Sequence, residues 1–195
     1  MSDSFVMLAD IDVTLDEATE LSSVVLDGLR KHGIIGNHAN EECVLGGTGF
    51  PPGQKIADIY KVAKREAPFW KLLTCGVSVR VERGFNEWAM GESCEGYTCP
   101  KCNGEIPPFD DDFILGDAIE DWYKNGSEGL GVNCPLCQKN SPLTKWVCRP
   151  PFAFSNLAFT FWNWPPFDDL AWQFDIPALV EDLTKHSIVH SYGHI

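Results

Sequence analysis

The stretch VSVRVER, residues 77–83, alternates strictly between apolar and polar side chains. In an extended chain its three valines fall on one face, and the serine, the first arginine and the glutamate fall on the other. A strand that is apolar on one face only is typical of an antiparallel sheet, because strands of an all-parallel sheet are buried on both faces. This stretch therefore predicts an antiparallel sheet with one covered face.

Other segments fit the same sheet. LAFTFW, residues 157–162, repeats the alternation, with a leucine and two phenylalanines on one face. Residues 5–13 begin as an apolar run and then alternate with aspartates, which predicts a first strand. Residues 187–192 predict a last strand, and a further short strand is expected over residues 43–45.

Helical patterns separate these strands. Thr14 and Glu17 have the spacing of a capping box, in which their side chains accept hydrogen bonds from the open N–H groups of the first turn. Gly33 can end that helix, because glycine readily takes the left-handed conformation of a C-terminal cap. Further amphipathic helices are predicted over residues 56–63 and 175–186.

Alternation of helices with half-apolar strands predicts an α+β fold, with an antiparallel sheet and helices on one face. The leading topology is a split βαββαβ arrangement, as in ferredoxin-like folds, with an insertion between its central strands. Residues 1–93 and 149–195 then form an α+β core domain, and residues 94–148 form an inserted module.

Composition and charge exclude several classes of protein. The 195 residues are 44% hydrophobic and 22% charged, as in globular chains, so extensive disorder is excluded. The net charge of −13 has the wrong sign for a protein that coats phosphates or anionic lipids. The longest uncharged run, residues 150–167, contains four prolines and predicts no membrane span. The first residues show no basic region before an apolar run, so we expect no targeting segment.

Two cysteine motifs, YTCPKCNG and NCPLCQ, dominate the middle of the sequence. A tight turn with C-x-x-C spacing brings two thiolates to one ion at about 2.3 Å, and two such turns complete a tetrahedron. Thiolates select Zn²⁺ or an iron centre over Mg²⁺ or Ca²⁺, and we expect zinc because it needs no redox partner. Metal ligands rather than disulfides indicate a reducing compartment, so we predict a cytoplasmic protein. The four predicted ligands are Cys99, Cys102, Cys134 and Cys137.

These C-P-x-C turns resemble the knuckles of a zinc ribbon, a small β-module around a four-cysteine zinc site. The resemblance covers residues 97–140 and implies one structural Zn²⁺ bound by those four cysteines. The first knuckle is followed by the small residues Asn103 and Gly104, whereas residues 138–140 of the second lack the glycine that often follows there. A site closed by four protein thiolates leaves no position for water or substrate, which implies a structural role.

The segment between the knuckles is acidic and contains a helical pattern. From residue 95 to residue 137 there are nine acids and two lysines. The aspartates that precede the helix can form a solvated capping turn, and a carboxylate cation site is the alternative. Glu105 extends the same negative surface. The acids predicted to contact a partner are Asp110, Asp111, Asp112, Asp117, Glu120 and Asp121.

Three functional hypotheses follow. The leading one is a non-enzymatic, zinc-stabilised binding module, of inhibitor or adaptor type, whose acidic face docks a basic protein partner. The second is a nucleic-acid-associated zinc-ribbon factor. Phosphate contacts need lysines and arginines, of which the module has almost none, so we expect no binding to generic nucleic acid. The third is an enzyme with a site at the junction of sheet and ribbon. No residue is assigned as catalytic or cofactor-binding.

Several other motifs have two interpretations. His186, His190 and His194 predict either a metal- or pH-sensing site or scattered surface histidines. GGTGFPPG, residues 46–53, lacks the spacing of a phosphate loop and predicts a turn-rich connection. Residues 159–174 are rich in aromatics, which suits a recognition surface or a core. The cysteines without an assigned role, of which only the third is a candidate substitute ligand, are Cys43, Cys75, Cys94 and Cys148.

Overall fold

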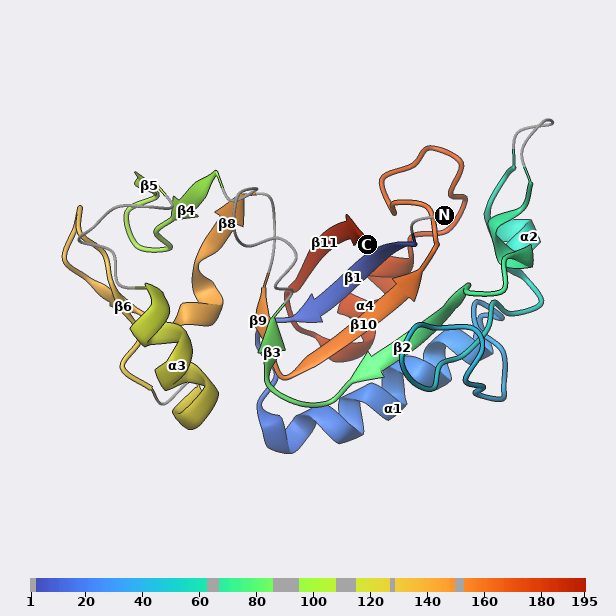
Figure 1. The fold of residues 1–195 in the computed structure, drawn as a ribbon, viewed down its shortest axis with the longest axis horizontal. Helices are drawn as coiled ribbons and strands as arrows, with labels where there is room; N and C mark the ends of the chain where they lie inside the picture. Colours follow the sequence, from blue (N-terminus) through green and yellow to red (C-terminus); the bar gives the residue numbers. More distant parts are fainter. Residues whose placement is uncertain (1–2, 63–66, 86–94, 108–114, 127–128, 150–152) are drawn as a thin grey trace.

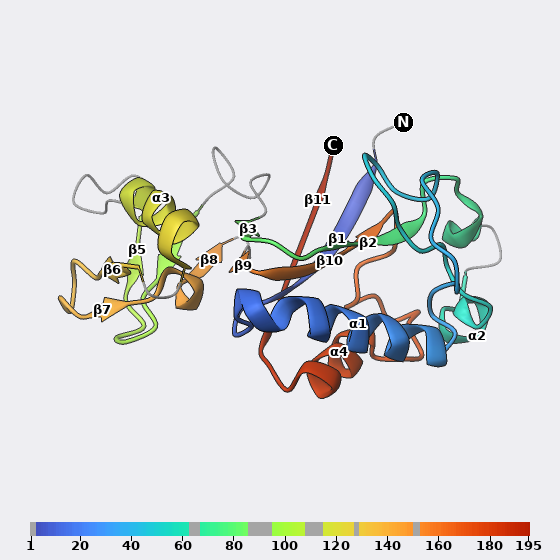
Figure 2. The same cartoon turned by 90° about the horizontal axis from the view of Figure 1, so that it is seen from below.

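The computed structural model describes the chain outside residues 1–2, 63–66, 86–94, 108–114, 127–128 and 150–152. Its main sheet has four antiparallel strands in the order β11-β1-β10-β2. The strands are β1 (Ser4–Asp10), β2 (Gly76–Arg80), β10 (Leu157–Trp162) and β11 (Ile188–His194). Helices α1 (Leu15–Lys31) and α4 (Ile176–Thr184) pack against each other on one face of this sheet (Figure 2).

The main elements follow the chain order strand, helix, two strands, helix and strand, and the sheet places the last strand beside the first. This is the split βαββαβ topology. The predicted α+β class is therefore confirmed, with helices on one face of an antiparallel sheet. Two small elements, α2 (Ile56–Ile59) and the 3-10 turn η1 (Phe69–Lys71), lie between α1 and β2.

Both ends of α1 are set by the residues that the sequence indicated. The Thr14 hydroxyl accepts from the Glu17 N–H at 3.4 Å, and the Glu17 carboxylate accepts from the Thr14 N–H at 3.2 Å. At the other end Gly33 is left-handed, with φ 69°, and the Ile34 N–H donates to the Leu29 carbonyl at 2.9 Å. The capping box and the glycine cap are confirmed.

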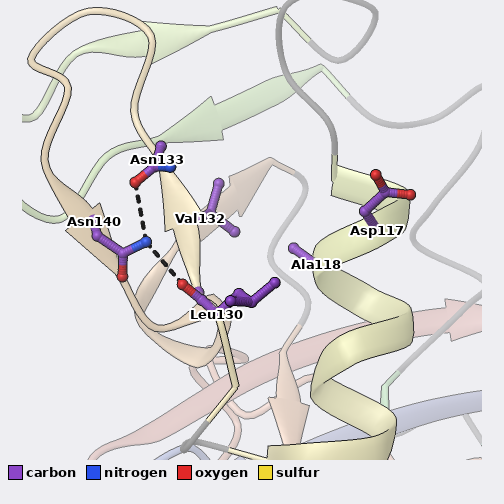
Figure 3. Close-up of a pocket in the computed structure, with 7 residues that line it drawn as sticks. Asp117, Ala118, Leu130, Val132, Asn133 and Asn140 are labelled. Atoms are coloured by element: carbon purple, nitrogen blue, oxygen red, sulfur yellow. Dashed lines mark hydrogen bonds between the residues drawn. The ribbon is translucent and has the colours of Figure 1, made fainter.

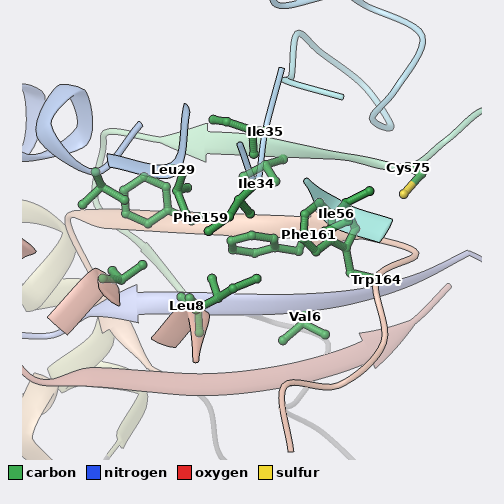
Figure 4. Close-up of a cluster of buried hydrophobic side chains, with 14 of the residues drawn as sticks. Val6, Leu8, Leu29, Ile34, Ile35, Ile56, Cys75, Phe159, Phe161 and Trp164 are labelled. Atoms are coloured by element: carbon green, nitrogen blue, oxygen red, sulfur yellow. The ribbon is translucent and has the colours of Figure 1, made fainter. Parts of the chain in front are cut away.

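The hydrophobic core lies between the sheet and the two helices (Figure 4). Val77 is opposite Phe161 and Val79 is opposite Phe159, so both strands direct the apolar side of their alternation to the same face. Full burial of one such side chain contributes about 1.5–3 kcal/mol. Other fully buried members from the sheet and from both helices are Leu8, Leu29, Leu157, Ile176 and Val180.

Two predicted helices are shorter than the pattern suggested. The helix predicted over residues 56–63 is a single turn, because Tyr60 takes an extended backbone and forms a bridge with Trp172. Their rings lie 4.7 Å apart, and this tertiary contact outweighs helix propensity. The helix predicted over residues 175–186 ends at a left-handed Lys185, with φ 63°.

Two predicted strands also differ. The strand predicted over residues 5–13 ends at Asp10, whose carboxylate accepts the N–H groups of Asp12 and Val13, each at 3.0 Å. These bonds turn the chain toward α1. Residues 43–45 form no strand in the described part of the chain, where Cys43 instead follows a turn held by the Asn40 side chain.

The insertion leaves the sheet from the β2–β10 pair (Figure 1). β2 stops at Arg80, earlier than predicted, and the chain continues into β3 (Gly84–Phe85), which pairs with β9 (Phe154–Ser155). Beyond this pair the described residues form two small sheets, β5-β4-β8 and β6-β7, and the α-helix α3. Their bounds are β4 (Gly96–Thr98), β5 (Glu105–Ile106), α3 (Leu115–Asn125), β6 (Val132–Asn133), β7 (Asn140–Ser141), the 3-10 turn η4 (Leu143–Lys145) and β8 (Val147–Arg149).

A second hydrophobic cluster fills this inserted module. It includes Trp122 of α3, and its ring centroid lies 5.4 Å from that of Phe154 in β9. The cluster therefore includes a residue beyond 94–148, the range predicted for the module. Two of the four predicted metal ligands, Cys99 and Cys134, are buried members of the same cluster.

Polar contacts connect the module to the sheet. The Arg83 guanidinium donates to the carbonyls of Tyr123 and Lys124 at 2.7 and 2.9 Å, at the C-terminal end of α3. A cation at this end of a helix satisfies open carbonyls and complements the helix dipole. On the other side, the Lys145 ammonium of η4 pairs with the Asp12 carboxylate, which follows β1.

Candidate metal centre

The four cysteines predicted as ligands converge on one point of the module. All four Sγ atoms lie within 4.8 Å of one another, and two of the separations, Cys99–Cys137 and Cys102–Cys134, are 3.9 Å. A tetrahedral ion with metal–sulfur bonds of about 2.3 Å places its sulfurs about 3.8 Å apart. The group therefore has the dimensions of a site that could hold a metal ion.

Two hairpins with the same backbone conformation carry these cysteines. In the β4–β5 hairpin the Asn103 N–H donates to the Cys99 carbonyl at 2.9 Å, and in β6–β7 the Gln138 N–H donates to the Cys134 carbonyl at 2.7 Å. Asn103 and Gln138 are both left-handed, with φ 57° and 58°. Although its sequence lacks the usual glycine, the second turn thus has the geometry of the first.

The two turns also pack on each other. A Cβ atom at Gly104 would lie 2.4 Å from a terminal carbon of Leu136, so the side chain of the second turn covers the backbone of the first. Only glycine fits at this position without a shift of Leu136. The packing holds the two pairs of sulfurs face to face.

Hydrogen bonds to sulfur shape the ionisation of the group. Burial opposes ionisation of Cys99, but N–H groups of Lys101 and Cys102, together with the neighbouring thiols, lower the pKa of Cys99 to about 7. For Cys102 the Gly104 N–H favours the thiolate, but burial and the three other sulfurs raise its pKa to about 12. A bound cation would displace the remaining protons, because metals bind cysteine as thiolate.

The chemistry of a four-sulfur site is that of a structural centre. Four protein ligands complete a tetrahedron, so no coordination position is left for a substrate or an activated water. The other described cysteines, Cys43, Cys75 and Cys148, are buried, and none belongs to this group. Cys94, the candidate substitute ligand, lies outside the described residues.

Three acids in or beside the predicted docking face form contacts within the chain. Glu105 pairs with Arg149 at 2.8 Å, and Glu120 pairs with Lys124 at 2.5 Å. The Asp121 carboxylate accepts the Leu130 N–H at 2.6 Å and so holds the loop after α3. Asp110, Asp111 and Asp112 lie outside the described residues.

Asp117 has a different environment, which the sequence did not indicate. It is exposed in the first turn of α3, and no hydrogen bond or ion pair is found for its carboxylate within the described residues. It lines a groove of about 570 Å³ between α3 and the β6–β7 hairpin (Figure 3). The other described residues that line it are Ala118, Leu130, Gly131, Val132, Asn133 and Asn140.

The wall of this groove opposite α3 is fixed by an amide. The Asn140 Nδ2 group donates to the Leu130 carbonyl at 2.8 Å and to the Asn133 Oδ1 at 3.0 Å (Figure 3). Leu130 is 79% exposed although it is apolar. The groove therefore combines a carboxylate that has no partner among the described residues, an exposed apolar side chain and ordered amides.

The histidines, the aromatic segment and residues 46–53, which the sequence left with two interpretations, have structural roles. His186 contacts the buried Asp10 carboxylate through Nδ1 at 2.9 Å, whereas His190 and His194 lie on β11 opposite Leu8 and Ser4. The three histidines therefore do not form one metal site.

In the aromatic segment, Trp164 is buried and stacks on Trp172 with ring centroids 6.0 Å apart, which favours the core interpretation. Residues 46–53 form a connection without a helix or an extended strand, and isolated bridges join Gly49 to Asn40, Phe50 to Val77 and Pro52 to Ile35.

Searches of protein-family models, curated proteins and solved structures find nothing that matches this chain. Within the described residues, no helix combines the length and the apolar character needed to cross a bilayer.

Proposed function

We propose that this protein is a non-enzymatic binding protein of the cytoplasm. In this proposal one Zn²⁺, bound by Cys99, Cys102, Cys134 and Cys137, holds an inserted module of the zinc-ribbon type that docks a basic protein partner. The observation that carries the proposal is the group of four sulfurs within 4.8 Å. A structural metal at this place fixes a small module and the surface that it presents, without supplying chemistry of its own.

Zinc is the metal that the ligand set favours. Four thiolates bind zinc or iron, and zinc fits a protein in which no electron-transfer partner is evident. No two of the described cysteines form a disulfide with each other, which supports a reducing compartment. Elemental analysis of the purified full-length chain tests this part. One zinc per chain is expected, whereas one iron per chain or no metal would contradict it.

The docking surface that we propose is the groove beside Asp117. A lysine or arginine side chain of the partner can lay its aliphatic stem against Leu130 and Val132 and bring its charge to the Asp117 carboxylate. Charge complementarity favours this occupant, because the chain has a net charge of −13. Glu105 and Glu120 already have basic partners within the module. For this reason we place the docking surface at Asp117 rather than at these two acids.

A labelled peptide that alternates lysine and leucine tests the docking surface by fluorescence anisotropy. The variant Asp117→Asn should weaken binding about fivefold or more, the effect of one charge-assisted contact. Asp16→Asn is the matched control, because Asp16 is also an exposed acid in the first turn of a helix, α1. A peptide with glutamate in place of lysine should not bind. Equal loss in both variants, or no loss in Asp117→Asn, would reject the groove as the docking site.

A further inference from the structure

A hollow lined by basic residues lies at the C-terminal end of α1, at the far end of the molecule from the inserted module (Figure 2). Its volume is about 330 Å³. Arg30 and Lys31 of the last turn of α1 and Lys55, which directly precedes α2, line it, and none of its described lining residues is acidic. In a chain with a net charge of −13, three cations around one hollow are an unusual local excess.

Backbone hydrogen bonds fix the walls of this hollow. The segment after α1 and the segment before α2 are joined by the Gly53 N–H, which donates to the Ile34 carbonyl at 2.7 Å, and by the Lys55 N–H, which donates to the Gly33 carbonyl at 3.0 Å. A Cβ atom at Gly53 would lie 2.3 Å from the Gly33 oxygen, so the two backbones are in direct contact. The hollow is thus preformed rather than a gap between loose loops.

The cations are largely without partners. Arg30 uses one guanidinium nitrogen for Asp27 at 2.7 Å, stacks over Phe50 at 4.6 Å, and leaves its buried Nε without a hydrogen bond. Lys31 and Lys55 form no ion pair with any described acid. Two ammonium groups and part of a guanidinium are therefore available to a ligand.

Helix capping does not account for these three charges. Basic residues in a last turn often serve its open carbonyls. Here the Gly33 N–H already donates to the Arg30 carbonyl at 2.8 Å, and the Ile34 N–H to the Leu29 carbonyl at 2.9 Å. Lys55 also comes from a different segment, beyond residues 46–53. A role toward something outside the chain explains the arrangement better.

We propose that this hollow binds the phosphate group of a small molecule. A dianion with several acceptor oxygens matches the charge and the donors of Arg30, Lys31 and Lys55, which a single carboxylate would satisfy only in part. The side chains hold the anion, since the N–H groups of Gly53 and Lys55 are already used within the chain. This binding differs from a phosphate loop, and it does not depend on the docking groove of the module.

Titration of the full-length protein with inorganic phosphate and with glucose 6-phosphate, followed by ¹H–¹⁵N NMR, tests the proposal. Saturable shifts are expected for the amides of Gly33, Gly36 and Gly53, at lower concentration for phosphate than for acetate. Tighter binding of the sugar phosphate would identify a phosphate monoester as the ligand, and tighter binding of inorganic phosphate would identify the free ion.

The double variant Lys31→Gln/Lys55→Gln should weaken this binding about tenfold, as expected for two lost charge-assisted contacts. Lys31→Arg/Lys55→Arg should restore it. Lys61→Gln/Lys71→Gln, which removes two exposed lysines that do not line the hollow, is the control. Equal weakening in both glutamine variants, or equal shifts with acetate, would overturn the proposal and leave only a general response to ions.

Discussion

The core sheet and the inserted module achieve their folds by different means. In the core the strands run for five to seven residues and two helices cover one face. The module has strands of two or three residues, and short strand pairs of this kind are marginal alone in water. Its hydrophobic cluster includes Cys99 and Cys134 themselves. The comparison teaches that the core is stabilised by apolar burial over long elements, whereas for the module, with its short strands, we expect a metal bound by the four cysteines to supply much of the stability.

The largest effect should come from removing one ligand. Cys134→Ser should abolish metal binding and unfold the module, because the binding energy of a structural zinc, about 10 kcal/mol or more, is folding energy. Metal content and the fluorescence of the module tryptophans measure the result. Cys148→Ser is the matched control, a buried cysteine of the same module outside the group of four. If it lost the metal as well, the assignment of the four ligands would fail.

A cavity in the core should destabilise the sheet and leave metal binding intact, the reverse of the effect of removing a ligand. Phe159→Ala removes a fully buried ring and should destabilise the sheet by about 3–5 kcal/mol. Chemical denaturation monitored by circular dichroism measures this loss, while the variant should still bind one metal per chain under native conditions. Loss of metal in proportion to the loss of stability would show that the two regions fold as one unit.

The contact between the two regions can be weakened directly. Arg83→Ala removes the hydrogen bonds to the Tyr123 and Lys124 carbonyls. It should lower the free energy of unfolding by about 1.5–3 kcal/mol, the range for hydrogen bonds of a charged group. Hydrogen exchange should become faster at the end of α3. The control is Arg149→Ala, which removes an exposed ion pair and should cost less than about 1 kcal/mol. Equal losses of stability in the two variants would show that Arg83 contributes no more than an exposed ion pair.

The smallest effect depends on pH. Partial burial raises the pKa of Asp12, but the Lys145 ammonium and the Ser187 N–H outweigh it and lower the pKa to about 2. Because the folded pKa lies below the ordinary 3.8, this carboxylate stabilises the fold above about pH 4, and the contribution is lost as the pH falls toward 2.

Thermal unfolding across this pH range compares the wild type with Asp12→Asn. The difference between their melting temperatures should shrink as the pH falls, and acid release of metal affects both proteins alike. Asp182→Asn, which removes an exposed pair with Lys185, is the control and should show little difference at any pH. A constant gap for Asp12→Asn would contradict the assigned pair.

Sequence patterns predicted what depends on near neighbours. The alternation that begins at residue 77, the box of Thr14 with Glu17 and the two C-x-x-C turns all act over a few residues, and the structure contains each of them, although the strand ends at Arg80. Tertiary contacts decided the rest. The Tyr60–Trp172 contact shortened α2, and the groove at Asp117 requires the approach of α3 to a hairpin that follows it in the chain.

The sequence also did not predict which charged side chains pair with each other. Counting acids between residues 95 and 137 predicts one negative face, but Glu105 lies beside Arg149, which comes from a later strand. A charge count contains no information on such partners. Lys31 and Lys55, which both line the basic hollow, are distant in the sequence. No local motif therefore indicates that they lie together.

Hydrogen exchange with and without a metal chelator tests the central claim most directly. With metal bound, amides of both β10 and the module hairpins should be protected. After chelation, protection should be lost across residues 95–149 and retained in β1 and β10, because we propose that only the module depends on a metal. Simultaneous loss of protection in both regions, or none in either, would contradict a metal-dependent module on an independently stable sheet.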